Sequence, residues 1–329
     1  MASGGGRVAG KMLVTMGGSV VVILAMVVGG IWKTGRKAIV SACPIAYVGT
    51  DRRLHLTNVT GTLDVELAGP AVDEGSGGST PPPAWSPFGT KILYHPYVTT
   101  RPAQKEIVVQ EPMSGRQWTL KLIKEGWIAG WASDENVLEC HVGFRDVRTG
   151  ALLQEVPREG FHVRQISPLP RGVGGGFVAI GPERDGDSVH LRDRGFDNPR
   201  TIFNSRGNCV PRVDPRGEWV GWTNEQFHRA GYPDGYLGKV IQIKRLNEAP
   251  ESLPRVLGEQ FAHAVFCDWT EDGDILANVQ EKSASPRPPW PGDWCLVILD
   301  KDGRLLRKIP TDVRPRAQSG ASWRKWGNR

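Results

Sequence analysis

The chain has 329 residues, of which 39% are hydrophobic and 23% charged, a composition typical of a globular protein with a sizeable core. Its net charge is only +6 and no block of five like charges occurs, which argues against a nucleic-acid partner. The five cysteines are widely spaced and form no Cys-x-x-Cys pair, which argues against a zinc signature and a disulfide framework. We expect buried free thiols, and a Cys267–Cys295 pair stays open as an alternative.

The amino-terminal segment contains a long uncharged run. Residues 1–11 are predicted to form a flexible tail, and residues 12–32 ("MLVTMGGSVVVILAMVVGGIW") carry no charge. A helix of this length rises about 31 Å, enough to span a bilayer. Trp32 and nearby Lys and Arg residues follow the run, as is typical of a membrane interface. We predict a transmembrane helix over 12–32 and a linker over 33–43.

A cleaved signal is the alternative for this segment. "VSAC" (40–43) resembles a bacterial lipoprotein cleavage box that ends at Cys43, but "KTGRK" separates it from the apolar run, which favours an anchor. The positive charges on either side of the run slightly favour a cytoplasmic location for the rest of the chain.

A repeated unit follows the amino-terminal segment. Its clearest copy is "PAWSPFGTKILYHP" (83–96), with a short strand ending at Trp85, a Ser-Pro-x-Gly turn and a second strand. Related units have their anchors at Trp131, Ile166, Val213 and Trp269. The successive anchors are 46, 35, 47 and 56 residues apart, mostly near the period of a propeller blade.

Each unit continues with two more predicted strands. The third strands are predicted at 106–110, 142–147, 188–193, 240–245 and 295–300. Each is followed by a fourth strand, in several units after a tight Ser-Gly, Thr-Gly or Asp-Gly turn. Four antiparallel strands per unit is the anatomy of a propeller blade.

The units resemble the TolB-type propeller repeat, a WD-repeat-like motif of the form P-x-W-S-P-D-G-x-x-I-A-F. The match is best at 83–94, fair around Trp269 and Val213, and poor around Ile166, where "RGVGGG" departs from the turn. The resemblance implies an envelope-facing or periplasmic setting in a bacterium, and the membrane anchor predicted above is added to it. It carries over no partner, because the repeat residues are structural.

The first unit lacks its first strand, and the end of the chain supplies one. "ASWRKWG" (321–327) aligns with "AWSPFG", which places Trp323 on the anchor position, 54 residues after Trp269. We therefore predict an all-β, six-bladed β-propeller over 44–329. In this interpretation the carboxyl-terminal strand completes the first blade, and Trp323 and Trp326 are closure residues that leave no free sheet edge at the join.

The chain shows no arrangement of catalytic or metal-binding residues. No Gly-x-Ser-x-Gly elbow occurs, and the seven histidines have no metal-ligand spacing. "ERDGDS" (183–188) and "EDGD" (271–274) resemble fragments of calcium loops, but Asp-Gly is a standard hairpin signal, so both are interpreted as turns. We expect no catalytic residues, no metal and no cofactor.

Long links between second and third strands are the most informative feature for function. They lie at 95–105, 223–239 and 279–294, and in a propeller they share one face with the links between blades, such as 68–83. Aromatic and arginine side chains there are typical of protein-contact hot spots, although they could instead pack their own loops. The candidate partner-binding residues are Tyr97, Arg101, Phe227, His228, Tyr232, Tyr236, Arg287, Trp290 and Trp294.

These observations predict a non-enzymatic scaffold that is anchored in the membrane by residues 12–32 and binds other proteins. It would be an extrinsic accessory subunit that stabilises a larger membrane complex. The alternative is a propeller enzyme or small-ligand binder, hydrolase- or lactonase-like, that uses the central channel.

Overall fold

The structure is a computed structural model of the chain. It describes residues 35–68, 83–94, 106–121, 128–132, 134–140, 143–155, 165–168, 177–183, 186–192, 200–205, 211–228, 237–282, 293–311 and 321–324.

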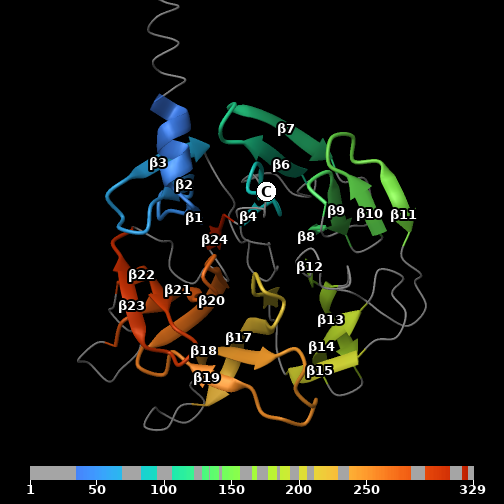
Figure 1. Ribbon diagram of the computed structural model, residues 1–329, viewed down its shortest axis with the longest axis vertical. Helices are drawn as coiled ribbons and strands as arrows, with labels where there is room; N and C mark the ends of the chain where they lie inside the picture. The colour runs from blue at the N-terminus through green and yellow to red at the C-terminus, as the bar shows by residue number, and fades with distance from the viewer. Residues whose placement is uncertain are drawn as a thin grey trace, which may run out of the picture.

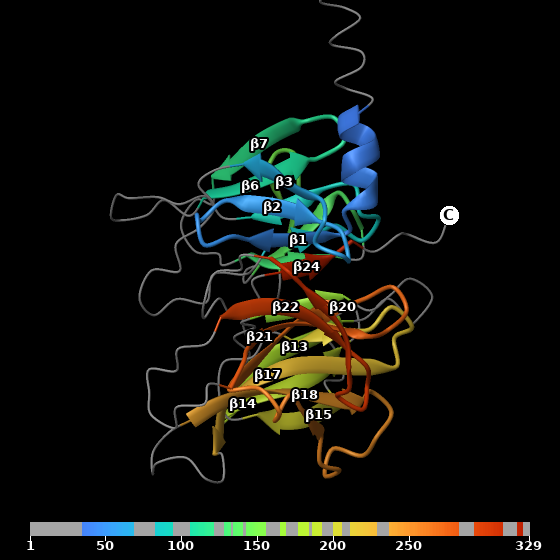
Figure 2. The same ribbon diagram turned by 90° about the vertical axis from the view of Figure 1, so that its left-hand side faces the viewer.

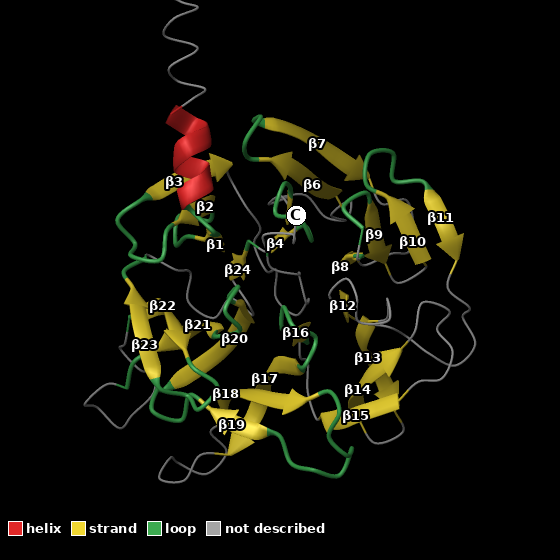
Figure 3. Cartoon of the chain, in the orientation of Figure 1, coloured by secondary structure: helices red, strands yellow, loops and turns green. Residues whose placement is uncertain are grey.

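The described strands form six four-stranded antiparallel sheets arranged in a ring (Figure 1). In each sheet the first strand lies near the centre of the ring and the fourth lies at the rim, as Figure 3 shows most clearly for β8 to β11. The all-β propeller predicted from the repeat is therefore confirmed.

The first three sheets lie in chain order around the ring. The first consists of β24 (Ala321–Trp323), β1 (Ile45–Val48), β2 (Leu54–Thr57) and β3 (Asp64–Ala68). The second consists of β4 (Ala84–Trp85), β5 (Ile92–Tyr94), β6 (Glu106–Glu111) and β7 (Arg116–Lys121). The third consists of β8 (Ile128–Trp131), β9 (Val137–Cys140), β10 (Gly143–Asp146) and β11 (Leu152–Glu155).

The other three sheets complete the ring. The fourth consists of β12 (Gln165–Pro168), β13 (Phe177–Glu183), β14 (Gly186–Arg192) and β15 (Arg200–Ser205). The fifth consists of β16 (Arg212–Val213), β17 (Trp219–His228), β18 (Leu237–Arg245) and β19 (Arg255–Leu257). The sixth consists of β20 (His263–Trp269), β21 (Ile275–Gln280), β22 (Trp294–Leu299) and β23 (Leu305–Ile309).

The strand connections divide the ring into two faces, and Figure 2 shows the ring edge-on. We call one the turn face: it carries the tight turns from first to second strand and from third to fourth strand, such as 86–91 and 112–115. We call the other the loop face: it carries the links from second to third strand and from one sheet to the next. The predicted long links start and end on the loop face.

The core lies between neighbouring sheets, because the middle strands are buried on both sides. In β1, Ile45 and Tyr47 pack with residues of the sixth sheet, whereas Ala46 and Val48 pack against the second sheet. This alternation is the two-residue period of a strand with apolar neighbours on both faces. It explains why residues on both faces of the middle strands are apolar, as in "IAYV" and, apart from Asn278, in "ILANV".

The carboxyl-terminal strand closes the ring as predicted. β24 pairs antiparallel with β1, with Ile45 opposite Trp323 and Tyr47 opposite Ala321. Trp323 is only 8% exposed and packs with Cys267 and Leu276 of the sixth sheet. A strand from the end of the chain thus completes the sheet that the start of the chain began. Trp326, the second predicted closure residue, lies outside the described residues.

Glycine explains the repeated turn between the first and second strands. Gly89, Gly217 and Gly273 occupy the same place in three turns and have φ values of 64°, 71° and 85°. This left-handed region is readily accessible only to glycine, so the residue recurs in the repeat. In "EDGD", Gly273 N–H donates to Thr270 O at 3.1 Å, and the predicted turn is confirmed there.

A short helix over 35–42 precedes β1, within the segment 33–43 that was predicted to be a linker. It lies beside the first sheet at the turn face (Figure 2), and Val40 is fully buried against the core between the first two sheets. The predicted transmembrane segment 12–32 lies outside the described residues. Within residues 35–324, as far as they are described, no helix is long and apolar enough to cross a membrane.

Candidate functional site: the loop face

Three of the nine candidate partner-binding residues lie in the described part of the chain. Phe227 and His228 end β17, and Trp294 begins β22, so all three are at the loop face. The other candidates lie outside the described residues: Tyr97, Arg101, Tyr232, Tyr236, Arg287 and Trp290.

The predicted loop over 223–239 is partly a β-hairpin. β17 continues to His228 and β18 starts at Leu237, with His228 opposite Leu237 and Phe227 opposite Gly238. The register shifts between Asn224 and Phe227, as in a β-bulge. A bulge bends and twists the strand, and pairing continues on either side of it. The polar sequence around the bulge, which is not typical of a strand, therefore still belongs to β17. The paired ends of β17 and β18 therefore extend the fifth sheet toward the loop face.

Beside this hairpin, three strands of the sixth sheet place a row of side chains at the loop face. His263 lies opposite Gln280 in β20 and β21, and Gln280 lies opposite Trp294 in β21 and β22. The rings of His263 and Trp294 stack, with centroids 5.9 Å apart and planes at 11°. Both side chains are half-buried, whereas Gln280 is buried. We call His263, Gln280 and Trp294 the aromatic row.

The imidazole of His263 is held by the neighbouring sheet. Lys239 N–H of β18 donates to His263 Nδ1 at 3.3 Å, so this nitrogen acts as the acceptor of the ring. The fifth and sixth sheets thus fix the aromatic row from two sides. The sequence alone does not single out His263 as a site residue. The feature that could have indicated a role for His263 is its position at the start of β20, in the same sheet as β22, which begins at Trp294.

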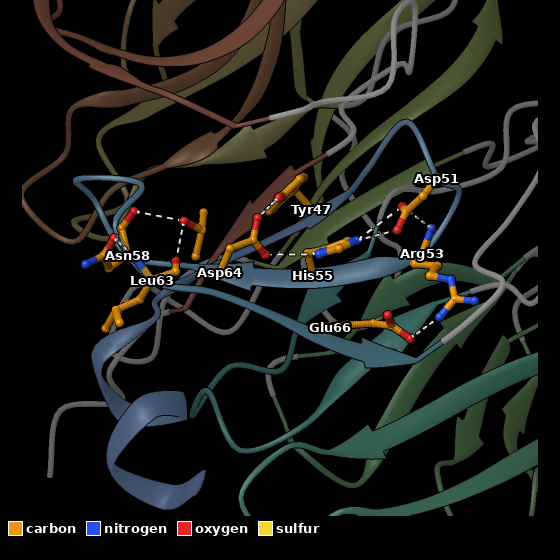
Figure 4. A network of polar contacts seen from close by, with 9 residues as sticks. Tyr47, Asp51, Arg53, His55, Asn58, Leu63, Asp64 and Glu66 are labelled. Atoms are coloured by element: carbon orange, nitrogen blue, oxygen red, sulfur yellow. Dashed lines mark hydrogen bonds and ion pairs between the residues drawn. The ribbon is translucent and has the colours of Figure 1, made fainter. Parts of the chain in front are cut away.

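A polar cluster lies on the first sheet (Figure 4). His55 Nδ1 is 3.0 Å from Asp64 Oδ1, and His55 Nε2 is 3.0 Å from Asp51 Oδ2. Tyr47 donates its hydroxyl to Asp64 and stacks on His55, with centroids 5.2 Å apart. A carboxylate thus lies beside each ring nitrogen of His55.

The Asp51 carboxylate orders the turn from β1 to β2. It accepts a 2.9 Å hydrogen bond from Arg53 N–H. Burial by itself would raise the pKa of Asp51, but the hydrogen bonds from Arg53 and His55 lower it below its ordinary value. Among the described residues, in this cluster and elsewhere, no group of three His, Cys, Asp or Glu side chains is placed to hold a metal ion. Its geometry orders the turn.

The buried carboxylates near the inner strands are engaged in structural bonds. Asp268 accepts from Ser322 and from the backbone of Trp323, and Asp214 accepts from Trp219 N–H at 2.9 Å. Glu135 accepts from Ser86 Oγ at 2.6 Å and pairs with Lys91 Nζ at 3.2 Å. These groups hold turns and inner strands together.

Three cysteines, Cys43, Cys267 and Cys295, are buried free thiols. The Cys267–Cys295 pair considered from the sequence is not formed. Burial raises the pKa of Cys43 to about 11 and that of Cys267 to about 12. Thiols with such pKa values remain protonated near neutral pH and are weak nucleophiles.

Comparisons with known proteins support the fold. No protein-family model matches the chain, and no curated protein matches it closely enough to show a family. TolB from Acinetobacter baumannii superposes with a TM-score of 0.59 at 15% identity, over 85% of this chain and 66% of that protein. A structure assigned as TolB from Agrobacterium tumefaciens gives 0.48 at 14% identity, over 80% and 87% of the two chains. The superposition on TolB from Acinetobacter baumannii shows that the chain has a TolB-like β-propeller fold.

Proposed function

We propose that this protein is a non-enzymatic interaction module, anchored in the membrane by residues 12–32, that binds a protein partner through its loop face. The observation that carries the proposal is the aromatic row, in which half-buried Trp294 stacks on His263 at the edge of a rigid sheet. Large aromatic groups that are already ordered provide contact area at low entropic cost, as in interaction hot spots.

The two faces of the ring support this assignment of roles. The helix over 35–42 joins the start of β1, and β24 ends at Trp323; both points lie on the turn face. An anchor that leaves from the turn face keeps the loop face accessible to a partner. Long links on a rigid scaffold are where binding residues are usually found. We further propose that the propeller is periplasmic and serves as an extrinsic subunit of a membrane complex.

The test is a comparison of co-purifying proteins. Tagged full-length chains would be gently solubilised from membranes, and their partners quantified by mass spectrometry. We expect the double variant His263→Ala/Trp294→Ala to lose a specific set of partners by about tenfold or more, since a hot-spot residue contributes about 2 kcal/mol. Leu253→Ala is the matched control, because Leu253 is 85% exposed on the turn face.

Equal recovery of every partner by the wild type, the double variant and the control would contradict the proposed role of the loop face. Protease accessibility in intact spheroplasts tests the location separately. Digestion of the propeller from outside is expected, and protection until the cells are lysed would contradict a periplasmic location.

A further inference from the structure

The helix over 35–42 is fixed to the ring by one arginine from the other end of the chain. Arg324, 2% exposed, donates from Nη1 to Val40 O at 3.0 Å and from Nη2 to Ser41 O at 2.8 Å. Its backbone N–H donates to Pro44 O at 2.7 Å. The last carbonyls of a helix have no partner within the helix, so the guanidinium satisfies two of them. The helix therefore keeps one orientation relative to the ring.

A second contact ties the helix to the second sheet. Ser41 Oγ lies 4.0 Å from Met113 Sδ, in the turn between β6 and β7. The guanidinium of Arg36 lies against Gly115 of the same turn, within 3.2 Å of where a Cβ would be. Arg324 also places its guanidinium 5.3 Å from the centroid of the Trp85 ring. The helix thus contacts both of the first two sheets.

The surface around this helix carries exposed apolar and basic side chains, with the carboxylates of Glu111 and Asp64 at its border. We call residues 35–42, 59–63 and 112–115 the helix patch. Its three segments contain no Asp or Glu, while Arg36 and Lys37 supply positive charge. Three large apolar side chains are partly exposed there: Ile39 at 39%, Leu63 at 37% and Met113 at 36%. Apolar side chains beside cations are the composition of segments that rest on an anionic membrane surface.

The turns of the fifth and sixth sheets, on the same face, differ sharply. They span residues 214–218, 246–254, 270–274 and 300–304 and contain three basic residues, Arg216, Lys301 and Arg304. Their acidic residues are Asp214, Glu218, Glu248, Glu251, Glu271, Asp272, Asp274, Asp300 and Asp302. Anionic headgroups would repel these turns and attract the helix patch.

Chain length brings the helix patch to the bilayer. Residue 35 follows the last residue of the proposed anchor by three positions, so it lies within about 11 Å of the anchor's end. Because Arg324 fixes the helix to the ring, the turns 59–63 and 112–115 also lie close to the bilayer. We propose that the helix patch rests on anionic lipid headgroups, that the acidic turns are tilted away, and that the loop face points outward from the membrane. This rests on the proposed membrane anchor.

The test measures depth with the full chain reconstituted in vesicles of phosphatidylcholine and phosphatidylglycerol. A fluorophore would be placed on Ile39→Cys, Met113→Cys, Glu271→Cys or Asp293→Cys, with the labelled wild type as background for the native thiols. A quencher on the lipid headgroup should quench labels at 39 and 113 several-fold more than labels at 271 and 293. Circular dichroism would check that each variant folds.

Two outcomes separate this proposal from the anchor itself. A chain that fails to float with the vesicles would overturn the anchor and the orientation with it. A chain that floats, but in which label 113 is quenched no more than label 293, would overturn the orientation alone. In Arg324→Lys we expect label 39 to stay quenched and label 113 to lose much of its quenching; equal quenching in that variant would overturn the role of Arg324.

Discussion

The closure between the sixth and first sheets uses different hydrogen bonds from the boundary between the fifth and sixth sheets. At the boundary between the fifth and sixth sheets, Trp269 Nε1 of β20 donates to Arg212 O of β16 at 2.8 Å, and Trp131 Nε1 makes the same bond to Ala84 O between the second and third sheets. At the closure, Trp323 occupies the equivalent anchor position, but no acceptor for its indole N–H is found among the described residues.

A carboxylate and a hydroxyl hold the closure instead. Asp268 Oδ2 accepts from Ser322 Oγ at 2.9 Å and from Trp323 N–H at 3.0 Å, and Ser322 Oγ accepts from Trp85 N–H at 3.3 Å. This relay links the inner strands of the sixth, first and second sheets. Hydrogen bonds to a charged acceptor are roughly twice as strong as neutral ones. The relay therefore strengthens the one join at which strands of a sheet come from opposite ends of the chain.

The largest effect should come from removing the closure strand. Deletion of residues 320–329 exposes the edge of β1 and removes Trp323 and Arg324, so we expect loss of the cooperative thermal transition, as measured by circular dichroism. Deletion of 325–329 is the control, because it keeps β24 and Arg324. A cooperative transition in the longer deletion would contradict the closure. A similar loss in the shorter one would show that Trp326 or its neighbours take part.

The second largest effect is expected at the relay. Asp268→Ala leaves Ser322 and Trp323 without their buried charged acceptor, which should cost about 3 kcal/mol of unfolding free energy in urea titrations. Gln260→Ala is the control, since its amide donates from an exposed position, in the link between the fifth and sixth sheets, to Gly303 O in a turn of the sixth sheet. A cost for Asp268→Ala no larger than that for Gln260→Ala would show that the relay does not hold the closure.

The closure could be predicted from the sequence, whereas the helix and the aromatic row could not. Trp323 follows Trp269 at the period of the repeat, and the first unit visibly lacked a strand. The helix over 35–42 depends on Arg324, whose carbonyl partners lie at the opposite end of the chain. The His263–Trp294 stack likewise depends on the register of β20 against β21 and of β21 against β22. Periodicity indicates which strands exist, but not which side chains meet across them.

A smaller effect, dependent on pH, is expected where a carboxylate joins the second and third sheets. Burial by itself would raise the pKa of Glu135, but bonds from Ser86, Thr90 and Lys91 lower it below its ordinary value of 4.5. A lowered pKa in the folded state stabilises the fold above pH 4.5, and this stabilisation is lost as the pH falls through the folded pKa. Glu135→Gln should therefore cost about 1–2 kcal/mol at neutral pH.

The pH dependence distinguishes this bond from simple packing. The difference in unfolding free energy between wild type and Glu135→Gln should shrink as the pH falls below 4.5 and through the folded pKa of Glu135, because the wild-type carboxylate is then protonated too. Asp134→Asn, in the same turn, is the control for a carboxyl that does not join two sheets. A difference that stays constant from pH 7 to pH 3 would contradict a role for the Glu135 charge.

The smallest expected effect is the difference in stability between tryptophan substitutions at the closure and at two other sheet boundaries. Trp269→Phe removes the bond to Arg212 O as well as part of the ring, whereas Trp323→Phe removes part of the ring and an indole N–H without an acceptor among the described residues. Loss of a neutral hydrogen bond costs about 1 kcal/mol, so Trp269→Phe should be the more destabilising by about that amount in urea titrations. Trp131→Phe, which also loses a bond to a carbonyl, should resemble Trp269→Phe. Equal costs at all three positions would mean that the tryptophan bond does not distinguish the closure from the second–third and fifth–sixth boundaries, and that the relay alone does.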